Sequence, residues 1–165
     1  MLLYSDIISD DEMFSDAFPM KTIDDIVFEV DCQLITIKAG ANVDIGANPS
    51  AEEQEEALEE GAVQVNNVVH SFRLQSTSFD KTSYFTYLKA YMKAVKARLP
   101  ESRVQAFEKG AAVYAKKIIA NFKDFEFYTG EGMNPDGMVA LLNYREDGIT
   151  PYFTFWKDGL KETKL

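Results

Sequence analysis

The sequence is poor in cysteine and histidine and contains no long apolar run. Its 165 residues include one cysteine, Cys32, and one histidine, His70. A single thiol excludes an internal disulfide, and one histidine without other ligands nearby favours a structural role over metal binding or catalysis. No apolar run reaches the length of a membrane-spanning helix, and the first residues lack the basic region of a signal peptide. We therefore expect a cytoplasmic protein without a membrane partner.

Recognisable enzyme motifs are also absent. The chain has no nucleophile beside a base, no glycine-rich phosphate loop and no set of four metal ligands. Glu131 and Asp136 form an acid pair, but the glycines between and beside them explain this stretch as a loop. We expect no enzymatic activity and no required cofactor.

Basic residues are scarce overall, with 17 against 27 acidic residues, a net charge of −10 and a pI of about 4.6. This balance argues against indiscriminate nucleic-acid binding, and no motif for sequence-specific nucleic-acid recognition is present. Hydrophobic residues make up 46% of the chain, enough for a substantial core. The length predicts one domain spanning residues 1–165.

The apolar pattern of residues 79–122 predicts two helices that pack against each other. Apolar residues from Tyr84 to Leu99 recur at steps of three and four, which is typical of one buried helix face. Asp80 or Ser78 can cap this helix, and Pro100 is expected to end it. A second helix is predicted from about Ser102, with the inner row Val104, Phe107, Ala111, Tyr114 and Ile118. The short link predicts an antiparallel hairpin.

The charge of this hairpin differs from that of the remaining chain. Together with Lys123 it holds ten basic and three acidic residues, a net charge of +7, which leaves −17 elsewhere. Lys89, Lys93 and Lys96 follow one another at i, i+4 and i+7 beside the apolar face, where like charges cost a few tenths of a kcal/mol each. The stripe is either a solvated helix face or a docking surface for an acidic partner.

Strand patterns occur on both sides of the hairpin. Residues 23–30 and 33–38 are predicted to pair around a turn at Asp31 and Cys32, and residues 9–16 form a compact acidic turn anchored by Met13 and Phe14. Glu12 lies there among other carboxylates, which suits a cation or a basic partner surface. Further strands are predicted at residues 2–7, 65–74, 125–129, 138–144 and 151–156. The pattern as a whole predicts an α+β fold.

Residues 39–64 carry a dense run of glutamates and few large apolar side chains. Self-repulsion predicts a long, flexible acidic loop. Ser50 precedes Ala51, Glu52 and Glu53, so it is a phosphorylation candidate of the acid-directed type, although such sites also occur by chance.

Three blocks resemble one known family in their order and spacing. They are residues 11–16 (DEMFSD), residues 45–53 (IGANPSAEE) and the glycine-rich region from Asn121 to Leu160 that includes GEGMNPDGMVALL and YREDG. Together they are similar to the signatures of the translationally controlled tumour protein family. The resemblance covers essentially the whole chain.

The resemblance implies a twisted β-tent-like sheet core with a protruding helical hairpin and a flexible acidic loop. It also implies a cytosolic protein, in part cytoskeleton-associated, that takes part in protein synthesis, growth control and microtubule binding. Its expected partners are tubulin and the translation machinery, since tubulin tails are acidic and the hairpin is basic. The tubulin-contact candidates are Lys89, Lys93, Lys96, Lys116 and Lys117.

The same resemblance implies weak calcium binding, with ligands that the sequence does not identify. The positive hairpin is a poor calcium site because a hard cation needs clustered oxygens. The alternative function implied by the resemblance is nucleotide exchange on, or chaperoning of, a Rheb-type small GTPase through Glu12. A carboxylate inserted near the magnesium and phosphate site would repel the nucleotide.

Overall fold

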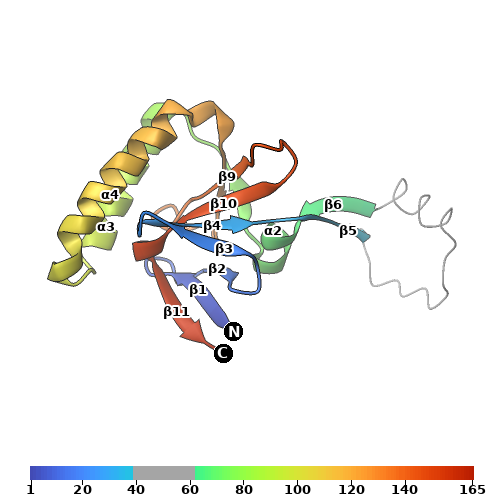
Figure 1. Ribbon diagram of the computed structural model, residues 1–165, viewed down its shortest axis with the longest axis horizontal. Helices are drawn as coiled ribbons and strands as arrows, with labels where there is room; N and C mark the ends of the chain where they lie inside the picture. The colour runs from blue at the N-terminus through green and yellow to red at the C-terminus, as the bar shows by residue number, and fades with distance from the viewer. Residues whose placement is uncertain (39–61) are drawn as a thin grey trace, which may run out of the picture.

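The computed structural model describes residues 1–38 and 62–165, and these residues form the expected α+β fold (Figure 1). The strands pair in three antiparallel sheets, ordered β11-β1-β2, β3-β4-β10-β9-β8-β7 and β5-β6. A helical hairpin lies along one side of the larger sheets, and the β5–β6 ribbon extends from the other side. Ser50 and residues 39–61 of the expected acidic loop lie outside the described residues, whereas 62–64 belong to β6.

The clearest strand prediction is confirmed. β8 (Glu126–Thr129), β9 (Ala140–Tyr144) and β10 (Pro151–Trp156) are adjacent and antiparallel in the six-stranded sheet. Gly148 in the turn before β10 has a φ of 69°, a backbone conformation that glycine adopts without a Cβ clash. Trp156 is buried as expected.

The second sheet places the N-terminal residues beside the C-terminal ones. β1 (Leu2–Asp6) pairs with β2 (Glu12–Ser15) and with β11 (Leu160–Lys164), a strand that the sequence pattern did not indicate. The interpretation of residues 9–16 as a turn is therefore only partly correct, because its second half is a strand. Met13 and Phe14 are fully buried there, as the expected anchors.

The predicted pairing of residues 23–30 with 33–38 is wrong. β4 (Val27–Asp31) pairs with β3 (Met20–Ile23) and β10, while β5 (Leu34–Lys38) pairs with β6 (Ala62–Asn66). The chain leaves one sheet at Cys32, whose backbone N–H donates to the Pro151 carbonyl at 2.8 Å. The pattern of apolar residues correctly indicated that most of these residues are extended, but it did not identify the strand with which each segment pairs.

The predicted strand at 65–74 is also wrong beyond Asn66. Residues Asn67–Phe72 form helix α2, followed by the short strand β7 (Gln75–Thr77). The Asn66 side chain accepts hydrogen bonds from the backbone N–H groups of Val68 and Val69, and this cap starts the helix despite the β-branched valines. His70 is therefore an exposed residue on a helix.

The helical hairpin is confirmed with small changes at its ends. α3 (Lys81–Lys96) begins at a capping box formed by Asp80 and Ser83, and it ends before Pro100 is reached. Pro100 instead precedes the first residue of α4 (Glu101–Ala120). The 3-10 turns η1 (Phe122–Asp124) and η2 (Lys157–Gly159) lead back to the strands.

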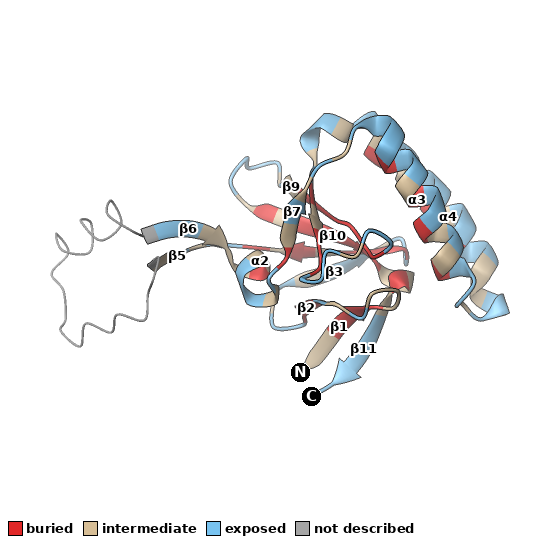
Figure 2. Ribbon diagram, turned by 180° about the vertical axis from the view of Figure 1, so that it is seen from behind, coloured by how far each residue is buried: buried red, intermediate tan, exposed pale blue. Residues whose placement is uncertain are grey.

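The core lies between the sheets and the inner face of the hairpin (Figure 2). α3 contributes Tyr84, Leu88, Tyr91 and Val95, and α4 contributes Phe107, Ala111 and Ile118. Val104 and Tyr114, also expected on the inner row, are half-buried, and the Tyr114 ring meets the edge of Trp156 at a centroid distance of 5.8 Å. The hairpin is thus packed on the body along its inner face.

Candidate functional site

Two tyrosines and a buried aspartate hold α3 in place. Asp6 is fully buried at the end of β1 and accepts a hydrogen bond from the Tyr91 hydroxyl at 3.1 Å and from the Met138 N–H at 2.7 Å. The Tyr87 hydroxyl donates to the Gly137 carbonyl and accepts from the Val139 N–H. Burial raises the pKa of Tyr91 and of Tyr87 well above their usual range, so both remain hydroxyl donors. The position of α3 relative to the body is therefore fixed by directed bonds as well as apolar packing.

The hairpin's arginines also serve to anchor it. Arg103 makes a bidentate ion pair with Asp158, at 2.8 Å for both contacts, and a further one with Asp25. These hydrogen bonds, with that from Asp158 dominant, raise the pKa of Arg103. Arg98 donates to the Ile7 carbonyl at 2.7 Å. The charge of these two side chains is thus directed toward the body.

The lysines behave differently from the arginines. Lys89, Lys93, Lys116 and Lys117 are exposed, and none of them pairs with a carboxylate within the residues described here. The Lys89 ammonium lies 4.8 Å from the centre of the Phe85 ring. Four of the five lysines predicted as tubulin contacts therefore present unneutralised charge to solvent.

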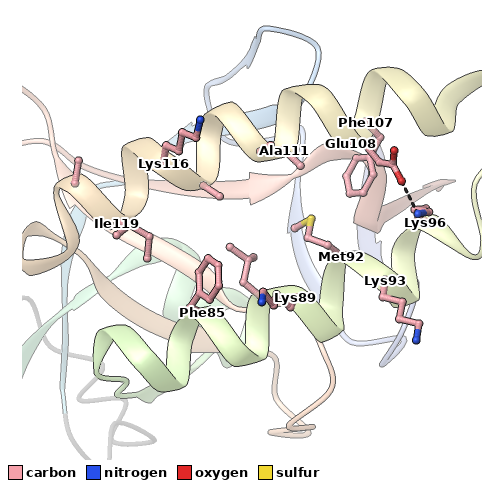
Figure 3. Close-up of a pocket in the computed structure, with 14 residues that line it drawn as sticks. Phe85, Lys89, Met92, Lys93, Lys96, Phe107, Glu108, Ala111, Lys116 and Ile119 are labelled. Carbon is pink, nitrogen blue, oxygen red and sulfur yellow. Dashed lines mark ion pairs between the residues drawn. The ribbon is translucent and has the colours of Figure 1, made fainter.

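Lys96, the fifth candidate, forms an ion pair with Glu108 that joins α3 to α4 (Figure 3). Both side chains remain 48% exposed, so the pair is weakened by solvent and salt. Its positive charge is partly neutralised by the molecule itself. The sequence did not indicate this pair, because the two residues come from different helices.

An apolar groove of about 760 Å³ runs between the two helices. The lysine side chains Lys89, Lys93, Lys96 and Lys116 line it together with apolar residues of both helices (Figure 3). The sequence pattern placed Phe85 and Met92 on the buried face of the first helix together with Tyr84 and Leu88. This expectation is wrong for Phe85, which is 45% exposed, and both residues line the groove instead. The apolar face of α3 is wider than its contact with the body, so part of it faces the groove.

Glu12 lies at a second, polar cavity of about 420 Å³ lined also by Asp10, Asp11, Arg73 and Glu131. The expected negative field is smaller than the sequence suggests. Lys161 hydrogen-bonds to Asp10 and lowers its pKa, and Arg73 pairs with Glu131 at 3.3 Å. Glu12 is exposed and has no ion-pair partner among the residues that the structure describes.

Glycines allow the 130–137 loop to approach this cavity. A Cβ at Gly130 would lie 2.4 Å from the Asp11 carboxylate, and the Gly132 N–H donates to the same carboxylate at 3.3 Å. Glu131 is exposed and held by Arg73, whereas Asp136 is exposed at another point of the loop. Both acids therefore lie in a loop whose path depends on its glycines, as the sequence analysis expected.

Cys32 lacks the surroundings of a reactive thiol. Cys32 is buried, and desolvation raises the pKa of its thiol to about 11, which disfavours the reactive thiolate at neutral pH. Within residues 1–38 and 62–165, no group of three His, Cys, Asp or Glu side chains is placed to hold a metal ion. In the same ranges, no helix combines the length and apolar character needed to cross a membrane.

These features define a class of protein: a small α+β protein in which a basic helical hairpin is anchored on antiparallel sheets by its tyrosines and arginines. The profile of the translationally controlled tumour protein family matches residues 1–161. The chain belongs to this family.

Individual relatives support the same assignment. The chain is 67% identical to the translationally controlled tumour protein homologue of Mycosarcoma maydis and 64% identical to that of Schizosaccharomyces pombe, each over the full length of both chains. Among solved structures, the S. pombe translationally controlled tumour-associated protein is similar with a TM-score of 0.85 at 62% identity, covering all of both chains. The Caenorhabditis elegans protein has a TM-score of 0.72 at 33% identity, over 100% of this chain and 99% of that one.

Proposed function

We propose that this chain is a non-enzymatic, cytoplasmic interaction protein whose hairpin binds acidic protein surfaces. Tubulin tails and acidic components of the translation machinery are the proposed partners, and a fraction of the protein is cytoskeleton-associated. The observation that carries this proposal is the set of exposed hairpin lysines without carboxylate partners among the described residues, Lys89, Lys93, Lys116 and Lys117.

The energetics favour a partner over water for these lysines. Lys89 and Lys93 are one helical turn apart, and like charges at this spacing destabilise a helix by about 0.2–0.5 kcal/mol. An acidic partner removes this repulsion and is attracted over roughly 8–10 Å at physiological salt. Such binding accelerates association and weakens steeply as salt rises.

Microtubule co-sedimentation over a salt series tests this proposal. We expect Lys89→Glu/Lys93→Glu to weaken binding about tenfold or more, because two attractive charges become repulsive. Wild-type binding should fall as ionic strength rises.

A matched control reverses two exposed lysines outside α3 and α4, Lys123→Glu/Lys164→Glu, and neither of them has an ion-pair partner among the described residues. This variant has the same net charge as the hairpin variant and should bind nearly as well as wild type. Equal binding by the hairpin variant and wild type, or binding insensitive to salt, would show that the hairpin lysines are not the contact.

We also propose weak calcium binding, without a dedicated cluster of ligands. Among the described residues, no three acidic side chains are placed to hold one metal ion. Asp10 and Glu131 are already paired with the cationic side chains of Lys161 and Arg73. Any calcium bound would therefore be held loosely, with water completing its coordination.

Nucleotide exchange on a Rheb-type small GTPase, or binding of its nucleotide-free form, is the second candidate function. Glu12 supports it, because this carboxylate is exposed at a polar cavity while its neighbours Asp10 and Glu131 are engaged by cations. An unpaired carboxylate can enter the magnesium and phosphate site of a partner without first breaking an ion pair.

Stopped-flow release of labelled GDP from a purified GTPase tests this role. Wild type should accelerate release, Glu12→Ala should lose most of this effect, and Glu146→Ala, an exposed acid in the turn before β10, should retain it. If Glu12→Ala and wild type release nucleotide at the same rate, this second function is wrong.

A further inference from the structure

The groove between α3 and α4 has more apolar surface than binding to acidic tails requires. Phe85 and Met92 line it from α3, and Phe85 is 45% exposed although it is a large aromatic residue. Figure 3 shows Phe85 and Met92 of α3 and Ile119 of α4 directed into the space between the two helices, whereas Lys93 and Lys116 point outward. Part of the lining consists of three buried residues, Leu88, Phe107 and Ala111. The groove is therefore continuous with the hydrophobic core.

The α4 side of the groove is built largely from small residues. It is lined by Ala112, Ala115 and Ala120, with Ile119 beside them. Small side chains let the backbone of another helix approach closely, toward the lower end of the usual 8–10 Å between helix axes. This wall is suited to a third helix lying over the pair.

Cationic groups surround this apolar surface. Lys89, Lys93 and Lys96 line the groove from α3 and Lys116 lines it from α4. Glu108 is the one carboxylate lining the groove within the described residues, and it is occupied by Lys96. An occupant must therefore be apolar at its centre and acidic at its edges.

We propose that this groove binds an amphipathic α-helix of a partner protein, with an apolar stripe and acidic residues on both flanks. The inference rests on the proposed function, because the same lysines take part, and it specifies the form of the acidic partner. From Phe85 to Lys96 the groove extends for about 16 Å of helix axis, at about 1.5 Å per residue. Three turns of a helix with apolar residues at i, i+3, i+4 and i+7 match this length.

Other acidic or apolar occupants match these features less well. A disordered acidic tail would satisfy the lysines but leave Phe85 and the alanine wall in water. A single-chain amphiphile such as a fatty acid would leave one side of its alkyl chain exposed, because Ala112 and Ala120 line the groove and are themselves exposed. A helix covers both walls and places acids over the lysines of α3 on one flank and over Lys116 of α4 on the other.

Fluorescence anisotropy with the full chain tests the inference. The probe is a labelled peptide of about 14 residues with leucines at the spacing above and flanking glutamates. Its control is a scrambled peptide of the same composition and charge, in which the leucines no longer share one face. We expect the patterned peptide to bind about tenfold or more tightly than the scrambled one, because only it buries apolar surface.

Two variants of the hairpin locate the binding site. Phe85→Ala removes groove wall without changing charge and should weaken the patterned peptide about tenfold while leaving the scrambled peptide unchanged. Val113→Ala truncates an apolar residue that is 57% exposed on α4 and does not line the groove, so binding should not change.

The possible failures are distinguishable. Equal affinity for both peptides, still lowered by Lys89→Glu/Lys93→Glu, would overturn the groove inference and leave the proposed function standing. Microtubule binding indifferent to that double variant would instead contradict the proposed function, while the peptide comparison reports on the groove separately. Self-association by sedimentation velocity that Phe85→Ala abolishes would assign the groove to a second copy and overturn the inference.

Discussion

Asp6→Ala is expected to lower the free energy of unfolding by about 3–5 kcal/mol. The buried carboxylate accepts hydrogen bonds from the Tyr91 hydroxyl, the Met138 N–H, the Ile8 N–H and both the N–H and the hydroxyl of Ser9. Alanine would leave the buried donors of Tyr91 and Met138 without an acceptor, and each unsatisfied buried donor costs about 1–3 kcal/mol before relaxation. The donors of Ile8 and Ser9 are only partly buried, so their loss costs less. The substitution would also disconnect α3 from β1 and from the loop before β9.

Urea denaturation followed by circular dichroism measures this effect. The exposed Asp16→Ala is a matched control, since Asp16 accepts one backbone hydrogen bond from Leu2 at 3.0 Å, and it should cost less than about 1 kcal/mol. Tyr91→Phe, which removes one of the donors, should fall between the two. A midpoint for Asp6→Ala close to that of Asp16→Ala would mean that Asp6 does not organise the hairpin.

Phe14→Ala should also cost about 3–5 kcal/mol, because a fully buried aromatic is replaced by a cavity. The Phe14 ring stacks on Tyr4 at 4.6 Å and on Phe155 at 4.4 Å between centroids, so it joins β1 and β2 to the six-stranded sheet. Glu12→Ala, two residues away, should change stability by less than about 0.5 kcal/mol because Glu12 is exposed and unpaired within the described residues.

Thermal or urea unfolding of these variants separates the anchor from the candidate contact. Phe85→Ala applies the same truncation to a half-exposed phenylalanine and should cost far less than Phe14→Ala. If Glu12→Ala destabilises as much as Phe14→Ala, a loss of GTPase-directed activity in that variant would reflect unfolding and not a lost contact.

Local pattern was sufficient for the elements whose apolar residues repeat regularly. The repeat from Tyr84 to Leu99 gave α3, and the strands around Gly148 were found with nearly correct ends. The apolar pattern was insufficient at Asn66. Val68 and Val69 are typical strand residues, but the Asn66 side chain caps their backbone N–H groups and a helix begins there. β3, β7 and β11 were missed since they are short or mostly exposed, and such strands carry no clear alternation.

The candidate site could be predicted only in outline. The excess of lysines in the hairpin was visible in the sequence. Which of them form ion pairs within the molecule was not. Lys96 is paired with Glu108 while Lys93, three residues earlier, is unpaired among the described residues, and Arg103 is bound to Asp158 across 55 positions. Charge is a property of composition, whereas neutralisation depends on which groups the fold brings within about 4 Å.

The sequence by itself determined the charge division between hairpin and body, the helical hairpin, the strands of the C-terminal meander and the family. Periodicity and composition act over a few residues, and helices and turns follow from them directly. Only the tertiary structure decided the pairing of β4 and β5, the bonds to Asp6 and the groove between α3 and α4. Each of these depends on contacts between residues far apart in the chain, which no local preference specifies.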